Sequence, residues 1–438
     1  MFWEDVMSAN GKQSLVIRNG TLIDSKGGPP VENDAIVVEG NRITSVGPVP
    51  GGMNLEDTEK VRVIDASGQW IMPGLIDGHC HLSFGQPDMP GLSIAKGSTS
   101  PEFNTIRAAI NAQTVLRAGV TSLSIPGGTW FTDVALREAI NAGLIEGPRI
   151  YCAGRFIVTY GSIGDYEPSW VGTPEHTLGT LANSVPEMIT EVRRQTKHGV
   201  DFIKMADSTW GDNQTISEEE LTAVVDEAHR RNARIAIHSR GSESTMAAAH
   251  AGVDWIMHAD LATEADLYAV AEQGVRIMPT MTFLEHAAKI GGAYGRGTAE
   301  MDLIKRNLEG AAEMLQTARN LGVKVMAGTD TGNSPLMPYG ELHGNEADIF
   351  VRHGGYTPME AIQACTRENA FAVGLEDQVG VIDSGMLADI IILDQDPLAD
   401  IRVLQGGRHL TAVIKDGKMV DLAGNEAQET AKLHFTKA

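Results

Sequence analysis

The chain has 438 residues, 42% of them hydrophobic, which suffices for a large core with an accessory unit and does not fit intrinsic disorder. Its 57 acidic residues outnumber its 35 basic residues, leaving a formal charge of −22. A surface of that sign repels the phosphate backbone of nucleic acids and anionic membranes, so we expect neither as a partner.

The chain carries no recognisable export or membrane signal. Its first residues have neither a basic region nor an apolar core, and eighteen consecutive apolar residues occur nowhere. The three cysteines, Cys80, Cys152 and Cys365, are too few for a disulfide framework. These features predict a cytoplasmic protein acting on a small molecule, and we expect it to form a homo-oligomer.

Short β-rich runs with glycine turns occupy both ends of the chain. Their composition predicts hairpins. We expect the two ends, residues 1–69 and 384–438, to pair into one small β-sandwich. The runs lie at residues 15–24, 34–47, 59–69, 386–394, 410–418 and 419–422.

Between the ends, residues 70–383 alternate apolar strand-like runs with helical patterns. Helix signals include a capping box at Ser217 and Glu220, opening a helix over 216–231, and Pro358 at a first helical position. Eight such units predict an α/β fold of the (β/α)8 TIM-barrel type. The eight strand-like runs are 69–78, 119–127, 149–158, 200–207, 233–241, 253–260, 275–282 and 323–332.

Polar residues stand at the carboxyl ends of several predicted strands, where barrels of this type place catalytic residues. His79 and His81 follow the first strand, and because they are two apart they face the same side and can share one ion. His238 and His258 end consecutive strands, which favours ligands over buried, hydrogen-bonded histidines. Asp330 ends the eighth and can touch both a metal and a water, although a helix N-cap is an alternative.

Lys204 lies inside the apolar run of the fourth predicted strand. An ammonium group there would face two cations, so we expect CO2 to convert it to a carbamate, an anion whose two oxygens can bridge two divalent ions. The alternative is an ordinary ion pair with Asp201 or Asp207.

Taken together, these residues make the chain resemble the amidohydrolase superfamily over nearly its whole length. The resemblance rests on the N-terminal β-rich run, on "MPGLIDGHCHL" at 72–82, on the strand-end residues and on "GVIDSGMLADIIILDQDPL" at 380–398. It is strongest for prolidase-like dipeptidases, metal-dependent carboxypeptidases and imidazolonepropionase relatives.

The resemblance implies a site with two divalent metal ions, usually zinc in such proteins. His79, His81 and Asp330 would hold the more buried ion, His238 and His258 the more exposed one, and carboxylated Lys204 would bridge them. A hydroxide between the metals would be the nucleophile, and Asp330 would pass its proton to the leaving amine.

The chain departs from prolidase-like relatives near the expected substrate pocket. The segment 158–168 lacks their Gly-His-Gly, and Arg240 stands where a tyrosine is common. Candidate substrate-binding residues are Tyr160, Arg240 and His343. Arg240 can pair a carboxylate in bidentate fashion or be tied to Asp260, and His343 can contact substrate or lie exposed at a helix start.

We therefore expect a metal-dependent hydrolase that cleaves an amide C–N bond of a dipeptide or N-acyl amino acid. Carbamate or urea-type xenobiotics are an alternative substrate class. Deamination of an aromatic ring is a second reaction, which needs a glutamate such as Glu243 near the fifth strand. A barrel serving only as a non-catalytic assembly subunit is the least favoured hypothesis, because the ligand set is complete.

Overall fold

The computed structural model describes residues 14–32, 35–48, 58, 60–84, 100–165, 168–172, 177–332 and 337–423. The expected terminal unit also spans 1–13 and 424–438, which lie outside the described residues.

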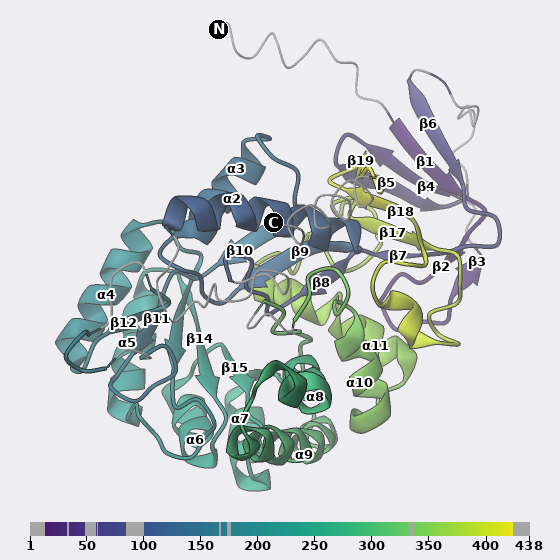
Figure 1. Ribbon diagram of the computed structural model, residues 1–438. Helices are drawn as coiled ribbons and strands as arrows, with labels where there is room; N and C mark the ends of the chain where they lie inside the picture. The colour runs from purple at the N-terminus through teal and green to yellow at the C-terminus, as the bar shows by residue number, and fades with distance from the viewer. Residues whose placement is uncertain are drawn as a thin grey trace, which may run out of the picture.

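Parallel strands followed by helices form the larger part of the molecule (Figure 1). The strands pair in two groups, in the orders β10-β9-β8 and β12-β11-β13-β14-β15-β16, and every pairing is parallel. Their bounds are β8 Leu75–Asp77, β9 Val120–Ile125, β10 Arg149–Cys152, β11 Phe156–Val158, β12 Gly179–Leu181, β13 Phe202–Ala206, β14 Arg234–Ser239, β15 Trp255–His258 and β16 Arg276–Met278.

Helices follow most of these strands along the chain, as in a β-α repeat, although β10, β11 and β12 follow one another without a helix between them. They are α2 Pro101–Arg117, α3 Thr132–Asn141, α4 Val185–Lys197, α5 Glu218–Arg230, α6 Ser242–Ala251, α7 Glu264–Gln273, α8 Met281–Ile290, α9 Thr298–Asn320, α10 Asn345–Gly354 and α11 Pro358–Ala364, with 3-10 turns η2 Gly291–Tyr294, η3 Glu368–Val373 and η4 Ile401–Leu404.

Local signals placed two of these helices correctly. Helix α5 begins after Ser217, whose side chain and that of Glu220 form the predicted capping box. Helix α11 begins at Pro358, as predicted, and adds a second capping box between Thr357 and Glu360. In both cases a side-chain oxygen satisfies a backbone N–H group that the first helical turn leaves without a partner.

The predicted eighth strand, residues 323–332, forms isolated bridges instead of a ladder. Val325 bridges Ile277 of β16, and Thr331 bridges Cys80 just after β8, both in parallel orientation. This segment therefore lies between β16 and the end of β8 and brings Asp330 beside the first strand. The parallel pairings do not run as one continuous ladder through the described residues, because β10 and β11 are not paired.

Strands from both ends of the chain lie side by side next to the β-α body, purple and yellow in Figure 1. One sheet has the order β5-β4-β1-β6 and the other β19-β18-β17-β7-β2-β3. Ile17 and Ile36 of the first sheet and Ile71, Ile390 and Ile414 of the second share one hydrophobic cluster. The bounds are β1 Ser14–Arg18, β2 Thr21–Leu22, β3 Val31–Glu32, β4 Ala35–Glu39, β5 Arg42–Gly47, β6 Val61–Asp65, β7 Trp70–Pro73, β17 Ile390–Leu393, β18 Leu410–Lys415 and β19 Lys418–Met419.

The first predicted strand, residues 69–78, divides into two strands of different sheets. β7 pairs with β17 and β2 in the terminal sheet, whereas β8 pairs with β9 in the β-α body. Pro73 has no N–H to continue a ladder, and a Cβ at Gly74 would lie 2.2 Å from the Thr121 side chain. The chain therefore changes sheets at Pro73-Gly74, and a sandwich bounded at 69 and 384 stays a prediction.

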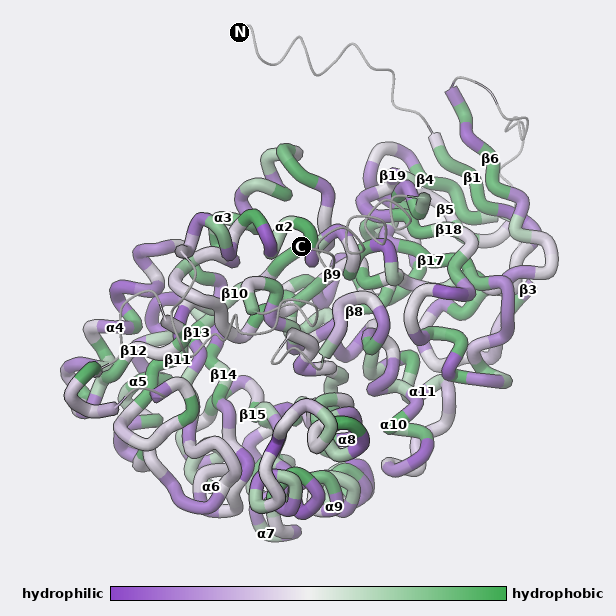
Figure 2. The backbone as a smooth tube through the Cα atoms, viewed as in Figure 1, coloured by the Kyte–Doolittle hydropathy of each residue, from purple (hydrophilic) through white to green (hydrophobic). Residues whose placement is uncertain are grey.

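Apolar residues concentrate along the strands of the interior, while the outer helices mix apolar and polar residues (Figure 2). All five residues of β13 are buried, as expected for a parallel strand covered on both faces. Within the described part of the chain, no helix has the length and apolar character needed to cross a bilayer.

Candidate metal centre

The six predicted ligands lie within, at the ends of or just beyond neighbouring strands and bridges of the β-α body, and each is less than 5% exposed. His79 and His81 follow β8, and Lys204 is the third residue of β13. His238 lies near the end of β14, and His258 is the last residue of β15. Burial of so many ionisable groups in one place is costly unless a partner compensates each of them.

His79, His81 and Asp330 converge on one point. The two Nε2 atoms lie 3.1 Å apart, and the Oδ1 atom of Asp330 lies 3.3 Å from Nε2 of His79 and 3.4 Å from Nε2 of His81. The backbone N–H of Asp330 donates to the carbonyl of His79 at 2.8 Å, which ties the two ligand segments together. These three residues form the group of side chains whose spacing suits one metal ion.

The hydrogen bonds of His81 leave the right nitrogen available for a metal. Its Nδ1 lies 2.6 Å from the carbonyl oxygen of Gly127, which can only accept, so Nδ1 carries the proton and Nε2 carries a lone pair. Burial lowers the pKa of His79 to about 4, so this imidazole is also neutral near pH 7. Two neutral imidazoles and a carboxylate are ligands that zinc prefers.

His238 and His258 form a second histidine pair beside the first. Their ring centroids lie 4.3 Å apart, and the His258 ring lies 5.5 Å from that of His79. Nε2 of His238 lies 3.2 Å from the carbonyl oxygen of Ser208, and Nδ1 of His258 lies 2.5 Å from Oγ1 of Thr280. Burial, aided by the charge of Arg240, holds both imidazole pKa values well below normal.

Two of the ligand positions have left-handed backbone geometry. The φ angles of His258 and Asp330 are 79° and 57°, a region that residues other than glycine adopt at a cost of about 1–3 kcal/mol. Such strain is concentrated at functional sites, where it fixes side-chain direction.

Lys204 is 1% exposed and forms no ion pair with any described residue. The two acids that could have paired with it are engaged elsewhere, since Asp201 binds Arg137 and Asp207 accepts from Thr215. Its Nζ contacts the sulfur of Met257 and lies 5.7 Å from the centre of the Phe156 ring. Burial lowers the pKa of Lys204 well below that of a free lysine, which favours the neutral form of the amine, the form that reacts with CO2.

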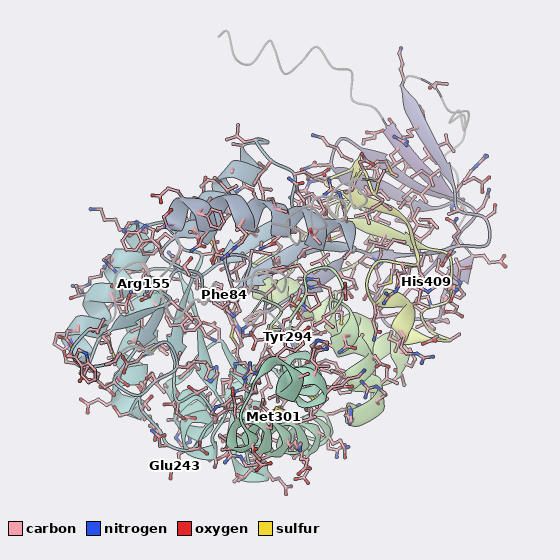
Figure 3. The ribbon with its side chains drawn as sticks, viewed as in Figure 1. Phe84, Arg155, Glu243, Tyr294, Met301 and His409 are labelled. Carbon is pink, nitrogen blue, oxygen red and sulfur yellow. The ribbon has the colours of Figure 1, made fainter. Side chains whose placement is uncertain are left out.

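A cavity of about 370 Å³ joins all six predicted ligands. Its apolar wall consists of Phe84, Phe156, Ile163 and Leu178, and Phe84 stacks on His81 with ring centroids 4.1 Å apart. Figure 3 shows Phe84 toward the middle of the β-α body. The three converging atoms of His79, His81 and Asp330, beside a buried amine that forms no ion pair among the described residues, fit a divalent metal ion in this cavity.

The three predicted substrate-binding residues occupy different places. Arg240 lines the cavity but forms a buried ion pair with Asp260. This pair is one of the two roles that the sequence predicted for Arg240. Tyr160 is 59% exposed and does not line the cavity. His343 is buried, not exposed at a helix start, and its Nδ1 pairs with Asp77 at 2.7 Å behind the ligand cluster. Substrate contact by Tyr160 or His343 therefore has no support in this geometry.

Sequence reasoning overlooked several residues that support the site. The carboxylate of Asp77 accepts a hydrogen bond from the backbone N–H of His79. Oγ1 of Thr280 is hydrogen-bonded to Nδ1 of His258, and the carbonyl oxygen of Gly127 accepts a hydrogen bond from Nδ1 of His81. The sequence did contain a signal for Asp77, because an acidic residue two positions before His79 is expected on the same face of the chain as that histidine. Thr280 and Gly127 had none, since only the packing of separate loops brings them to the histidines.

The glutamate considered for ring deamination is remote from the site. Glu243 is exposed in the first turn of α6, and Figure 3 places it at the outer edge of the molecule, away from Phe84. Deamination through Glu243 therefore has no geometric support.

Comparison with known proteins identifies relatives over most of the chain. A family model described as "Amidohydrolase family" matches residues 70–420. An ochratoxinase of Aspergillus niger is 29% identical, covering 94% of this chain and 88% of that protein, and an imidazolonepropionase of Geobacillus kaustophilus is 25% identical, covering 89% and 90%. A crystal structure of a Xaa-Pro dipeptidase with bound methionine superposes with a TM-score of 0.80 at 28% identity, covering 93% and 99%.

Proposed function

We propose that this chain, which belongs to the amidohydrolase family, is a metal-dependent hydrolase that cleaves the amide bond of a dipeptide or an N-acyl amino acid. The family predicted from the sequence is confirmed by the family model and by the relatives described above. The observation that carries the finer proposal is the convergence of His79, His81 and Asp330 next to Lys204, a buried amine without an acidic partner.

The residues would hold two divalent ions, zinc in the simplest case. His79, His81 and Asp330 would bind one, His238 and His258 the other, and the carbamate of Lys204 both. When bound, such ions lower the pKa of water to about 7 and polarise a carbonyl group. Formation of the carbamate joins the neutral Nζ of Lys204 to the carbon of CO2 and releases one proton, which the low pKa of Lys204 favours.

Asp330 is the proposed general base and acid. Its carboxylate would take a proton from the attacking water and return it to the leaving nitrogen, so that an amine and not an unstable amide anion departs. The left-handed backbone at Asp330 and its N–H bond to His79 hold that carboxylate in place. Positioned proton transfer of this kind contributes about 10²–10⁴-fold to rate.

The apolar wall indicates which kind of substrate group it would receive. Phe84, Phe156, Ile163 and Leu178 offer no hydrogen-bond donors and suit an aromatic or aliphatic group on the acyl side or the amine side. Arg240 is the cation on the cavity wall beside them, and Asp260 already balances its charge. Carbamates and ureas with apolar substituents would fit the same wall and are the second candidate class.

Hydrolysis of a substrate panel tests the proposal. We would assay the zinc-loaded protein on dipeptides, N-acyl amino acids, carbamates and ureas with matched apolar groups, using chelator-treated protein and Asp330→Asn as controls. We expect zinc-dependent release of amines from the amide substrates with apolar groups. Cleavage of carbamates or ureas alone would reassign the substrate class, and release of ammonia from ring substrates with one ion per chain would favour a deaminase.

A further inference from the structure

The buried carboxylate of Asp77 joins the two chain segments that carry the His79, His81 and Asp330 ligands. Its Oδ1 accepts the backbone N–H of His79 at 3.0 Å and that of Thr329 at 3.1 Å. Its Oδ2 accepts the hydroxyl of Thr329 at 2.6 Å. Asp77 and Thr329 are 252 positions apart in the sequence. His79 is itself a candidate ligand, and Thr329 directly precedes the candidate ligand Asp330.

His343 supplies the remaining hydrogen bond to Asp77. Its Nδ1 lies 2.7 Å from Oδ2 of Asp77, and a carboxylate can only accept, so Nδ1 is the donor. The imidazole lies just before α10 and is 1% exposed. Its Nε2 has no partner among the described residues, and its ring borders a separate cavity of about 250 Å³, with Glu346 and Cys365 on the same wall.

This arrangement separates His343 from the proposed chemistry. The cavity that His343 lines contains none of the six candidate metal ligands, and the cavity that contains them does not include His343. Among the described residues, Asp77 is the hydrogen-bonded link between this imidazole and the ligand cluster.

We infer that His343 is a positioning residue which, acting through Asp77, fixes the relative placement of His79 and Asp330 and so raises the affinity for the divalent ion that these residues bind. The inference rests on the proposed function, because it requires that the cluster binds a metal. Hydrogen-bond partners that orient metal ligands typically contribute about 10–100-fold to metal affinity. In this protein, the hydrogen bonds of Asp77 orient the backbone N–H of His79 and the turn before Asp330, and not the imidazole rings.

Three variants and one control test the inference. His343→Ala removes the donor, whereas His343→Asn places an amide N–H close to the position of Nδ1. The third substitution, Asp77→Asn, is made alone and together with His343→Ala, and tests whether the effect passes through Asp77. Thr366→Val is the matched control, since it removes the buried hydroxyl pair with Ser25, 2.6 Å apart, which contacts none of the candidate ligands.

Zinc affinity by competition with a chelating dye and melting temperatures of the metal-free and zinc-loaded proteins are the readouts. We expect His343→Ala to weaken zinc binding 10–100-fold and His343→Asn to recover most of it, while Thr366→Val lowers both melting temperatures equally and leaves zinc affinity unchanged. Adding His343→Ala to Asp77→Asn should lower the zinc affinity little further.

Wild-type zinc affinity in His343→Ala, with both melting temperatures lowered alike, would overturn the inference and make His343 a purely structural residue. A full additional loss in the double variant would also overturn it, because His343 would then act by another route. Failure of the wild-type protein to bind zinc would contradict the proposed function instead, so the two failures are distinguishable.

Discussion

Arg240, which lines the cavity, forms an ion pair with Asp260, and 3% and 0% of their side chains are exposed. Asn307 donates to the same carboxylate oxygen at 3.0 Å, and the Trp210 ring lies 5.6 Å from the guanidinium carbon. Removing one partner of a buried pair leaves the other charge uncompensated, which costs about 3–5 kcal/mol. Arg240→Met should therefore lower the free energy of unfolding by that amount, measured by urea denaturation of the metal-free protein.

The double variant Arg240→Met with Asp260→Leu is the control for that loss. Because it removes both charges, much of the lost stability should return. A single variant that loses less than about 1 kcal/mol would mean that water compensates Asp260 and that the pair is not a structural element.

A role for Arg240 in binding a substrate carboxylate needs a substitution that keeps the pair with Asp260. Nε of Arg240 is buried and has no partner within the described residues, and Arg240 lines the cavity. Arg240→Lys keeps the charge but loses the planar fork. We expect KM to rise by about ten- to hundredfold for substrates ending in a carboxylate, corresponding to about 1.5–3 kcal/mol, with little change for neutral amides. Equal losses for both classes would restrict Arg240 to its structural role.

Asp133, the second residue of α3, makes stability depend on pH. It is 1% exposed, neither carboxylate oxygen has a described partner, and burial raises its pKa from 3.8 to about 7. Since the pKa of Asp133 is higher in the folded state than in the unfolded state, the folded protein holds one more proton than the unfolded chain at pH values between 3.8 and about 7. The stabilisation is complete below pH 3.8 and is lost as the pH rises through about 7.

Asp133→Asn removes this titration while keeping the size of the side chain. As the pH rises from about 4 to about 7, we expect the free energy of unfolding of the variant to increase relative to that of the wild type, by at most about 1.4 kcal/mol per pH unit. Denaturation curves at several pH values would check this, and a constant difference across the range would show that Asp133 is ionised in the folded protein.

The candidate ligands were predictable because each breaks a local pattern. His79 and His81 are two residues apart just after a strand, a spacing that directs both side chains to the same side, and Lys204 interrupts an apolar run that is buried throughout. The sheet change at Pro73-Gly74 was missed although Pro73 marks it, because the flanking residues read as one strand. The pairing of His343 with Asp77, 266 residues apart, had no local signal, since it depends on how α10 packs against the body.

Lys204 gives a prediction in which stability and metal binding move in opposite directions. Lys204→Met removes a buried amine without an ion pair, so the metal-free protein should be as stable as the wild type or more stable. The same variant should lose one or both ions, measured by metal analysis, together with most activity. For Lys204→Ala, short carboxylates or high bicarbonate should restore part of the activity. Full metal content in both variants would leave Lys204 without a bridging role.

Asp330→Asn separates metal binding from proton transfer. The variant keeps the size of the side chain and an oxygen for the metal, but its amide does not accept a proton at neutral pH. We expect kcat for amides to fall at least about a hundredfold, with the fold retained and metal content only modestly lower. Activated aryl esters should lose less, because their leaving groups depart without protonation. Amide hydrolysis at the wild-type rate with both ions retained would remove Asp330 from the mechanism and require another base, which would have to lie within hydrogen-bond reach of the His79 and His81 cluster.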